Sequence, residues 1–486
     1  MVELAILLTS SLAVSALTPQ AAAVNAAARD SQAPPPAMCR ELRECLQLAA
    51  EAEERHDFET FHDLAWRAVQ LGPRNDPSLM YRLARAQALS GRPHDSLIML
   101  ERLAEMGVAT DAATNDDFRR TRALPDWADV EPVLARVGQA ADSRVLGPGL
   151  RSSEKSATTS SPPTSGAASR AVPPRAAASN TAAVRVPDAK LSATTVSSID
   201  QAVRVSSPRF SAAGLAYDAV SRRFVVGDLH DRKLMVVDET ADHAVDLVRA
   251  DSAGFRDIAA IEIDGRRGDL WVATVASEGS GWTLHRMQLL SGRPLRTVQV
   301  PADLEPLRLV DLAVSPAGAL LALDAAGDRL LVLRPGGTTP AVVPHLTVHG
   351  PTSVAATSDE KIVYIAHEAG VSRIDLTTGA SVLVTEPKDH DMKRIERIRW
   401  HGNALLAVQA NDSQTRRIVR FKLNGSGGKV TAATTLEASI PAASGPTFAT
   451  IAGDDLSYLV AAVDSAAPSP ATDQRTAFTI RRIRLP

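Results

Sequence analysis

The sequence lacks several features that would place it in a common class of protein. It has only 2 cysteines in 486 residues, Cys39 and Cys45, which excludes a disulfide-dense scaffold and a four-cysteine zinc site. No apolar run reaches the roughly 18 to 20 residues of a membrane span, so we expect no transmembrane segment. The 53 Lys and Arg are balanced by 56 Asp and Glu, and the net charge of -3 shows no basic excess. We therefore do not expect a nucleic-acid partner.

What is present supports a protein of several parts. Hydrophobic residues make up 45% of the chain, which is enough to build real cores, and 486 residues allow two to four domains. Residues 4–17, LAILLTSSLAVSAL, have about the length of a signal-peptide core and precede small residues of the A-x-A kind. They predict a signal peptide over 1–26 and a periplasmic or secreted protein. The first three residues carry no Lys or Arg, so a short Ala/Leu-rich helix stays an alternative.

The two cysteines are six residues apart. On one straight helix, six residues rise about 9 Å, which exceeds the usual Cα separation of a disulfide. Cys39 and Cys45 can therefore pair only if Cys39 lies outside the helix, and a helix start near 38–41, after Pro34, Pro35 and Pro36, allows this. An exported protein favours pairing. Two free thiols remain the alternative.

A helical repeat is predicted over 38–137. Asp57, Gly91 and Pro125 are spaced by 34 residues, and apolar residues between them recur at helical spacing. A helix-turn-helix unit of this length resembles the tetratricopeptide repeat, and the alternative is an unrelated helical bundle. Two to three such repeats are near the minimum for a stable stack. Such stacks usually bind a partner, so we expect a protein partner here.

A linker is predicted over 138–198. This segment is rich in Ser, Thr, Pro and Ala, and no aromatic residue occurs between Trp127 and Phe210. Such a composition cannot bury enough apolar surface to offset the entropy of ordering the chain. We expect a flexible tether that lets the parts on either side engage partners semi-independently.

Residues 199–486 contain one β-unit that recurs. Short apolar strands separated by Gly and Asp turns open each unit, and their central apolar residues stand 42 to 51 residues apart: Leu215, Ile261, Leu312, Val354, Ile398 and Phe448. Six units of this length predict a six-bladed β-propeller, with a β-sandwich as the alternative. The sixth unit has three clear strands, and 199–206 is predicted to supply the fourth. The fold class is therefore multidomain, all-α helical repeats followed by an all-β propeller.

The phrases GLAYDAVSRRFVVGD, IDGRRGDLWVATV, LVDLAVSPAGALLALD and IDLTTG over about 210–460 resemble the regucalcin/gluconolactonase-like family. The resemblance implies a divalent metal such as calcium at the mouth of the propeller, held by a Glu, Asn residues and an Asp. The positions that match these ligands are Ala213, Thr352 and Glu396, with Arg397 beside the last. Asp311, Asp257 and Glu262 are nearby carboxylates.

A methyl group, a hydroxyl and one carboxylate make a poor ligand set for a hard dication. We therefore expect no cofactor and no confident catalytic residue, with Asp311, Thr352 and Glu396 as the candidate residues at the propeller mouth. The paired arginines of the blade turns, such as Arg266 and Arg267, are interpreted as solvated.

The predicted function is that of an exported, non-enzymatic binding or scaffold protein. The helical repeats would bind a protein partner, and the propeller channel would be available to a small ligand. The alternative is a lactonase-like hydrolase that uses a divalent metal at the propeller mouth. A sensor for a small ligand or sugar is a third hypothesis.

Overall fold

We analysed a computed structural model of the whole chain. It describes residues 39–140, 145–146, 199–208, 210–229, 231–239, 243–250, 252–276, 281–411, 415–441, 447–461 and 475–486. The chain divides into two compact units, Met1–Ala37 and Met38–Pro486, and all described residues belong to the second. The predicted signal peptide over 1–26 and most of the predicted linker over 138–198 lie outside the described residues.

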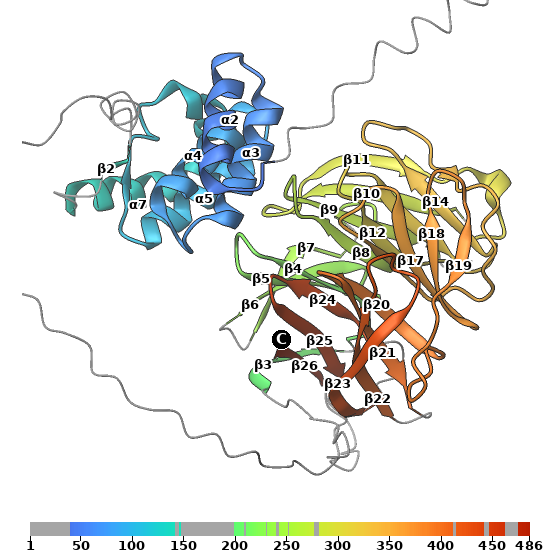
Figure 1. Cartoon of the computed structure of the whole chain (residues 1–486). Helices are drawn as coiled ribbons and strands as arrows, with labels where there is room; N and C mark the ends of the chain where they lie inside the picture. The colour runs from blue at the N-terminus through green and yellow to red at the C-terminus, as the bar shows by residue number, and fades with distance from the viewer. Residues whose placement is uncertain are drawn as a thin grey trace, which may run out of the picture. The chain divides into compact units, whose positions relative to one another are not determined.

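The N-terminal part of the described chain is helical, as predicted (Figure 1). Its helices are α2 (Leu42–Glu54), α3 (Phe58–Leu71), α4 (Pro77–Leu89), α5 (Pro93–Glu105), the short η1 (Asp116–Phe118) and α6 (Arg119–Arg122), and α7 (Trp127–Ala140). Capping sets where two of them begin. Asp57 accepts a hydrogen bond from the backbone N–H of Thr60, and Asp76 accepts from those of Ser78 and Leu79. In the described residues, none of these helices has the length and apolar character needed to span a bilayer.

The helices repeat as pairs. Helices α2 and α4 begin at Leu42 and Pro77, and α3 and α5 begin at Phe58 and Pro93, so both steps are 35 residues. Small residues between them, among them Ala65 and Ala84, are fully buried and let the helices approach closely. Helix α7 runs to Ala140, beyond the predicted boundary at 137, and β1 (Ala109–Thr110) pairs in parallel with β2 (Val145–Leu146). The helical character is confirmed, while membership of the tetratricopeptide family stays a prediction.

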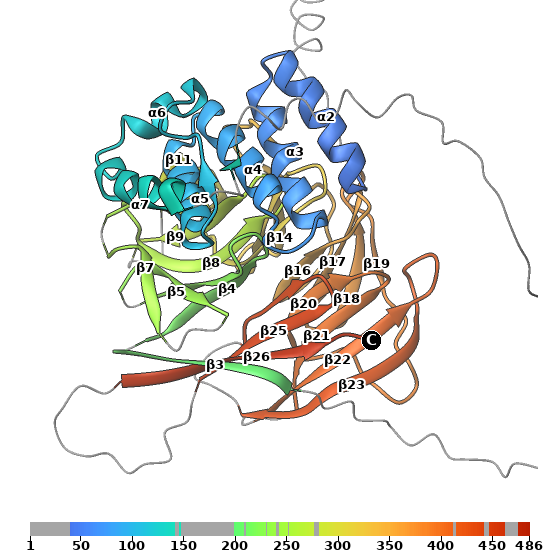
Figure 2. The same ribbon diagram turned by 90° about the vertical axis from the view of Figure 1, so that its left-hand side faces the viewer.

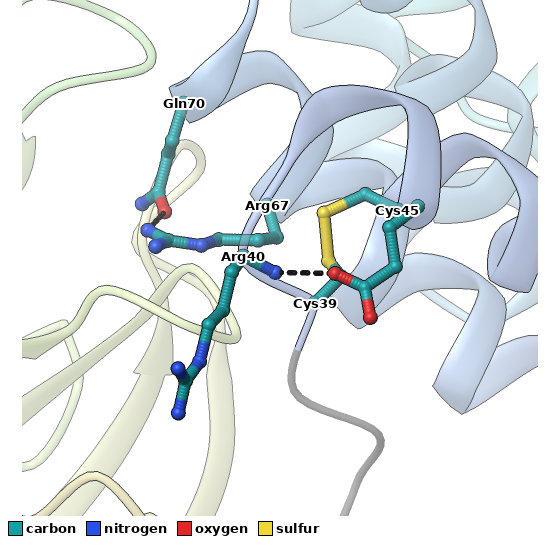
Figure 3. Close-up of a disulfide and its surroundings, with 6 residues drawn as sticks. Cys39, Arg40, Cys45, Arg67 and Gln70 are labelled. Carbon is teal, nitrogen blue, oxygen red and sulfur yellow. Dashed lines mark hydrogen bonds between the residues drawn. A yellow bond between two sulfur atoms is a disulfide. The ribbon is translucent and has the colours of Figure 1, made fainter.

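Of the two states left open for the cysteines, the disulfide is the one present (Figure 3). Cys39 is bonded to Cys45, and their Cα atoms are 5.1 Å apart. Cys39 precedes the first residue of α2, Leu42, as the pairing requires. Both cysteines are buried, and the backbone N–H of Arg40 donates to Glu44 at 2.8 Å. The bridge therefore fastens the entering chain to the first turn of α2.

The C-terminal part is the predicted propeller (Figure 1). In the described residues, its strands form six sheets of four, each of which is one blade. Blade 1 is β4 (Ala212–Asp218), β5 (Arg223–Asp228), β6 (Lys233–Asp238) and β7 (Ala244–Val248), and blade 2 is β8 (Asp257–Asp264), β9 (Asp269–Val275), β10 (Thr283–Gln288) and β11 (Pro294–Gln299). Blade 3 is β12 (Leu309–Val314), β13 (Leu320–Asp324), β14 (Arg329–Leu333) and β15 (Ala341–Val342), and it follows the short helix η3 (Ala302–Leu304).

Blades 4 to 6 complete the ring. Blade 4 is β16 (Ser353–Ala356), β17 (Ile362–His367), β18 (Gly370–Asp375) and β19 (Ser381–Leu383), and blade 5 is β20 (Ile395–His401), β21 (Ala404–Ala410), β22 (Thr415–Leu423) and β23 (Val430–Pro441). Blade 6 is β24 (Ala449–Ala452), β25 (Asp455–Ala461), β26 (Arg475–Arg484) and β3 (Ile199–Pro208). The first strands β4, β8, β12, β16, β20 and β24 each contact the first strands of the two neighbouring blades. They are therefore the inner strands of a closed ring.

The ring closes as the sequence predicted, by pairing the start of the propeller with its end. Figure 2 shows β3, in green, beside the red β26. The two strands are antiparallel, with Val203 opposite Ile480 and Val205 opposite Phe478. The ring of Phe478 stacks on that of Phe210, with centroids 4.3 Å apart. Pairing with β3 covers the outer edge of β26 and gives blade 6 four strands, as in the other blades.

The helices and the propeller share one core. Buried side chains of α3, α4 and α5 belong to the same hydrophobic cluster as those of blades 1 and 2, among them Leu270 and Met287. The indole N–H of Trp66 donates to the carbonyl of Gly265 at 2.9 Å, and Arg102 donates to the carbonyl of Ser221 at 2.8 Å. The expectation that the two parts act semi-independently is therefore wrong for the described residues, because contacts between the parts join them.

The interpretation of the paired turn arginines as solvated is also wrong. Arg267 forms an ion pair with Asp63 of α3 at 3.4 Å, and Arg266 donates to the carbonyl of Pro316 at 2.6 Å. Arg416 forms an ion pair with Glu396 at 2.9 Å. These turns face other parts of the chain, so their charges are used in contacts.

A buried ion network lies where the helices meet blade 2. Arg92 donates to Asp269 at 2.7 Å, and the same carboxylate also accepts from Arg286. The side chain of Asp269 is 0% exposed, so both cations are needed to balance it. Beside it, Asp95 is buried and accepts from the backbone N–H of Ser291 at 3.1 Å. Burial raises the pKa of Asp95 to about 7.

Candidate functional site

The three positions that match the family's metal ligands are engaged in separate contacts. Ala213 is buried on β4 and offers no ligand atom. The hydroxyl of Thr352, just before β16, donates to the carbonyl of Ile395 at 2.7 Å. The carboxylate of Glu396 on β20 accepts from Arg416 and from the backbone N–H of Thr447 at 3.3 Å. Among the described residues, no hydrogen bond or ion pair joins Thr352 and Glu396 to each other.

The fourth candidate, Asp311, lies at the centre of a cluster of charged side chains on the inner strands. It forms ion pairs with Arg397 at 2.9 Å and with Arg399 at 3.3 Å, both from β20. The hydroxyl of Ser353 and the backbone N–H of Val354, both from β16, also donate to it. We call Glu262, Asp311, Ser353, Arg397 and Arg399 the inner-strand cluster.

The inner-strand cluster joins blades 3 to 6 through hydrogen bonds. Ser353 accepts from the backbone N–H of Ile398 at 3.0 Å, so it connects Asp311 in blade 3 to blade 5. Arg399 donates through Nε to the carbonyl of Ala449 in blade 6 at 3.0 Å. Arg397 donates to the carbonyl of Val310 at 3.0 Å and lies 4.7 Å above the ring of Phe448.

The electrostatics of the cluster favour one ionised and one protonated carboxyl group. Burial works to raise the pKa of Asp311, but Arg397, Arg399 and the hydrogen bonds outweigh burial and hold the pKa below its usual value. Glu262, from β8, lacks this balance. Burial raises the pKa of Glu262 to about 7, although Arg399 works in the opposite direction. The cluster is therefore neutral or singly positive near pH 7.

Small residues elsewhere on the inner strands leave room for the two arginines. Arg397 and Arg399 stand directly before and after the central apolar residue of blade 5, Ile398. At the same two positions in the other blades, most residues are small: Gly214, Ala216, Ala260, Ala313, Ala355, Thr447 and Ala449. Blade 1 also requires its glycine, because Gly214 has a φ of 153° and a Cβ there would meet Ile261 at 2.6 Å.

These residues do not fit a divalent metal. Two guanidinium groups occupy the centre of the inner strands, and the one buried carboxylate held ionised there, Asp311, is already paired with both of them, so a further dication would be repelled. In the part of the chain that the structure describes, no group of three or more His, Cys, Asp or Glu side chains is placed to bind a metal ion. The cluster is also closed, since the side chains of Asp311, Arg397 and Arg399 are 3%, 5% and 14% exposed.

Arg397 and Arg399 were not predicted as partners of Asp311. The family pattern concerns three separate positions, in which Arg397 stands only as the neighbour of Glu396. The signal was the phrase RIRWH, which places two charges around an apolar residue in a strand predicted to be innermost. A buried strand position that carries arginine requires a buried carboxylate nearby, and Asp311 stands at the equivalent position of blade 3.

The chain has distant structural likenesses among known proteins. No family model matches the chain, and no curated protein matches it. Among solved structures, it resembles an aldose sugar dehydrogenase from Streptomyces coelicolor, with 13% identity and a TM-score of 0.40, over 58% of this chain and 98% of that one. It also resembles a gluconolactonase from Xanthomonas campestris (14%, TM-score 0.38, over 56% and 86%) and a calcium-binding regucalcin from Agrobacterium tumefaciens (12%, TM-score 0.38, over 58% and 93%).

These matches include both kinds of protein named in the resemblance, so the predicted resemblance is confirmed at the level of the six-bladed fold. TM-scores of 0.38 to 0.40 and identities of 12 to 14% carry no information about the activity of this chain. The residues of this chain must therefore decide its function.

Proposed function

We propose that this protein is an exported binding protein whose helical domain and propeller act as one unit, without lactone hydrolysis. The observation that carries the proposal is the inner-strand cluster. Asp311 is balanced by Arg397 and Arg399 at the centre of the ring, where a metal-dependent hydrolase would need convergent oxygen ligands and an open position. The centre of the propeller then serves to hold the blades together.

The proposed partner surface of the helical domain lies away from the propeller. The hydrogen bonds and ion pairs to blades 1 and 2 come from α3, the turn before α5, and α5 itself, through Asp63, Trp66, Arg92, Asp95 and Arg102. Helices α2, α4 and α7 make no such contacts among the described residues. Helix α4 is almost entirely buried, with only Ser78 exposed, so a protein partner would meet α2 and α7.

The alternative function is a lactonase-like hydrolase with a divalent metal such as calcium. The solved structures with a similar fold include a gluconolactonase and an aldose sugar dehydrogenase, which are enzymes, and a regucalcin named as calcium-binding. For this chain, the alternative needs a metal whose ligands would have to include Glu396 or Asp311. Both carboxylates are paired with arginines.

The deciding experiment uses the full chain after treatment with a chelator. Calcium, manganese and zinc are titrated in a thermal unfolding assay, and hydrolysis of sugar lactones is measured under the same conditions. A metal that binds the native state stabilises it by about 2.7 kcal/mol at a hundredfold excess over its dissociation constant. We expect no saturable, chelator-reversible stabilisation and no hydrolysis above background. Both effects together, lost in Glu396→Gln or Asp311→Asn, would establish the lactonase instead.

Export is tested separately. We propose that the mature protein begins between about residues 22 and 30, since small residues follow the apolar segment there. N-terminal sequencing of the protein from its native host should give such a start. Full-length protein with Met1 intact in the cytoplasm would contradict export and leave the binding proposal in place.

A further inference from the structure

A cleft between blades 2 and 3 gathers four arginine side chains. It is a shallow cleft rather than an enclosed cavity, with a volume of only about 20 Å³. Blade 2 contributes Arg267, Arg286 and Arg296, and the turn after β14 contributes Arg334. We call this the arginine cleft. It lies outside the inner-strand cluster and, unlike that cluster, includes an exposed arginine, Arg334.

The register of blade 2 places these charges in one row. Trp271 on β9 stands opposite Arg286 on β10, and Arg286 stands opposite Arg296 on β11. Side chains directly opposite one another on neighbouring strands lie on the same face of a sheet. Two arginines in such a pair repel each other, which destabilises the sheet unless an anion is shared between them.

The carboxylates near the cleft do not balance the arginines. Asp269 accepts from Arg286 but is shared with Arg92, and Asp63 pairs with Arg267 at 3.4 Å. Within the described residues, Arg296 and Arg334 have no carboxylate partner, and Arg296 donates to the carbonyl of Gly336 at 3.2 Å.

The remaining carboxyl group of the cleft lining, Asp264, is paired within its own turn. It accepts from the backbone N–H of Arg266 at 3.1 Å and lies 3.5 Å from the guanidinium group of that residue. The cleft therefore carries an excess of positive charge.

We propose that the arginine cleft binds a small molecule that carries a carboxylate or phosphate group. Guanidinium groups bind both kinds of oxyanion through paired hydrogen bonds. Trp271 and Leu333 line the same cleft but are buried, so the arginines provide the contact surface. Arg286 and Arg296 stand opposite each other on neighbouring strands and can share one anionic group, which favours a compact anion over a macromolecular partner. This inference rests on the proposed binding function, because it names the class of ligand.

The cleft also connects its ligand to the helical domain. Asp63 and Arg92, which belong to the helical domain, contact Arg267 and Asp269 at the edge of the cleft. An anion that takes the place of Asp63 at Arg267 would weaken one of the contacts that join the helices to blade 2. Ligand binding is therefore expected to change the strength of that contact.

The test uses the full chain with inorganic phosphate and with acetate as probes, and with chloride at matched ionic strength as the reference. Binding is measured by calorimetry and by the shift of the unfolding temperature. We expect saturable binding of phosphate, acetate or both. Arg296→Gln and Arg334→Gln should each weaken it about tenfold, which corresponds to the loss of one charged hydrogen-bond donor. The matched control, Arg249→Gln, removes an exposed arginine outside the cleft and should bind normally.

Three outcomes would overturn the proposal: no binding beyond the effect of chloride, binding that neither Arg296→Gln nor Arg334→Gln weakens, or binding of an acidic peptide but of neither small anion. The lactone assay is run on the same variants. Metal-dependent hydrolysis would refute the proposed function whatever the anion result, whereas absent hydrolysis with absent anion binding would refute the arginine cleft alone.

Discussion

Two parts of the molecule bury the same combination of charges, one aspartate with two arginines. In the inner-strand cluster, Asp311 is paired with Arg397 and Arg399, and where the helices meet blade 2, Asp269 is paired with Arg92 and Arg286. Both aspartates are almost fully buried. The two sites differ in which parts of the chain provide the two arginines.

Both arginines of Asp311 come from one strand, β20, and further hydrogen bonds come from β16. The ion pairs and hydrogen bonds of Asp311 are therefore complete once blades 3 to 5 have assembled. Asp269 receives one arginine from its own blade and the other from Arg92, 177 residues away in the helical domain. Its balance depends on docking of the helices. The same combination of charges thus holds the blades of the propeller together at Asp311 and joins the helical domain to blade 2 at Asp269.

The largest effect is expected from Asp311→Asn. The substitution leaves two buried guanidinium groups without a balancing charge, and breaking a buried ion pair in this way costs about 3 to 5 kcal/mol. Denaturant unfolding of the full chain should show that loss in the propeller. Asp303→Asn, at an exposed aspartate in η3, is the control and should change stability little. A loss below about 1 kcal/mol for Asp311→Asn would mean that its ion pairs with Arg397 and Arg399 contribute little to the stability of the propeller.

A pH-dependent effect should separate the two regions further. Burial raises the pKa of Asp95 to about 7 from 3.8. As the pH rises from about 4, the unfolded chain loses this proton while the folded chain keeps it, so the free energy of unfolding falls until the pH reaches about 7. Asp95→Asn should remove this contribution.

Glu262→Gln is the counterpart in the inner-strand cluster, where burial also raises the pKa to about 7. Denaturant unfolding at several values between pH 4 and pH 8 measures both contributions. Stability that rises over this range equally in Asp95→Asn and in the unmodified protein would contradict the assignment.

The third effect is expected from Arg92→Met, which removes the helical domain's cation and leaves Asp269 with Arg286. Loss of a hydrogen bond between charged groups costs about 2 to 3 kcal/mol. After protease cuts the predicted linker over 138–198, the helical fragment should separate from the propeller in Arg92→Met. In the unmodified protein, the two fragments should stay bound to each other. Arg55→Met, at an exposed arginine after α2, is the control. Separation of the unmodified fragments would show that the interface does not hold the parts together.

The smallest effect should come from the disulfide. A loop of six residues gives about 2 kcal/mol in the chain-entropy description. Reduction, or the double substitution Cys39→Ala and Cys45→Ala, should lower the stability of the helical domain by about this amount and leave that of the propeller unchanged. Thermal unfolding with and without reductant measures it. An equal effect on the propeller would contradict the local role.

The fold was largely predictable because its signals are periodic. The recurrence from Leu215 to Phe448 identified the inner strand of every blade, and the missing fourth strand pointed to 199–206. Tetratricopeptide membership was not decided, since α6 and η1 interrupt the helical period.

The contacts between helices and propeller were not predictable in the same way. Arg92, Asp269 and Arg267 are charged residues at or next to turns, and in one sequence such residues look solvated. Their burial depends on two domains meeting. The partners of the candidate site residues were not predictable for a related reason. Asp311 and Arg397 are recognised as an ion pair only after the blades are placed around a ring.

The closing strand also sets an order of events during synthesis. Strand β3 is made more than 250 residues before its partner β26, so it must stay unpaired until the last residues of blade 6 are available. Bringing together segments so far apart carries a large loop-closure entropy, and such pairing is slow. A ribosome that stops before 475 would release a chain whose five completed blades have no closing sheet, with β3 exposed as an edge ready to pair with another molecule.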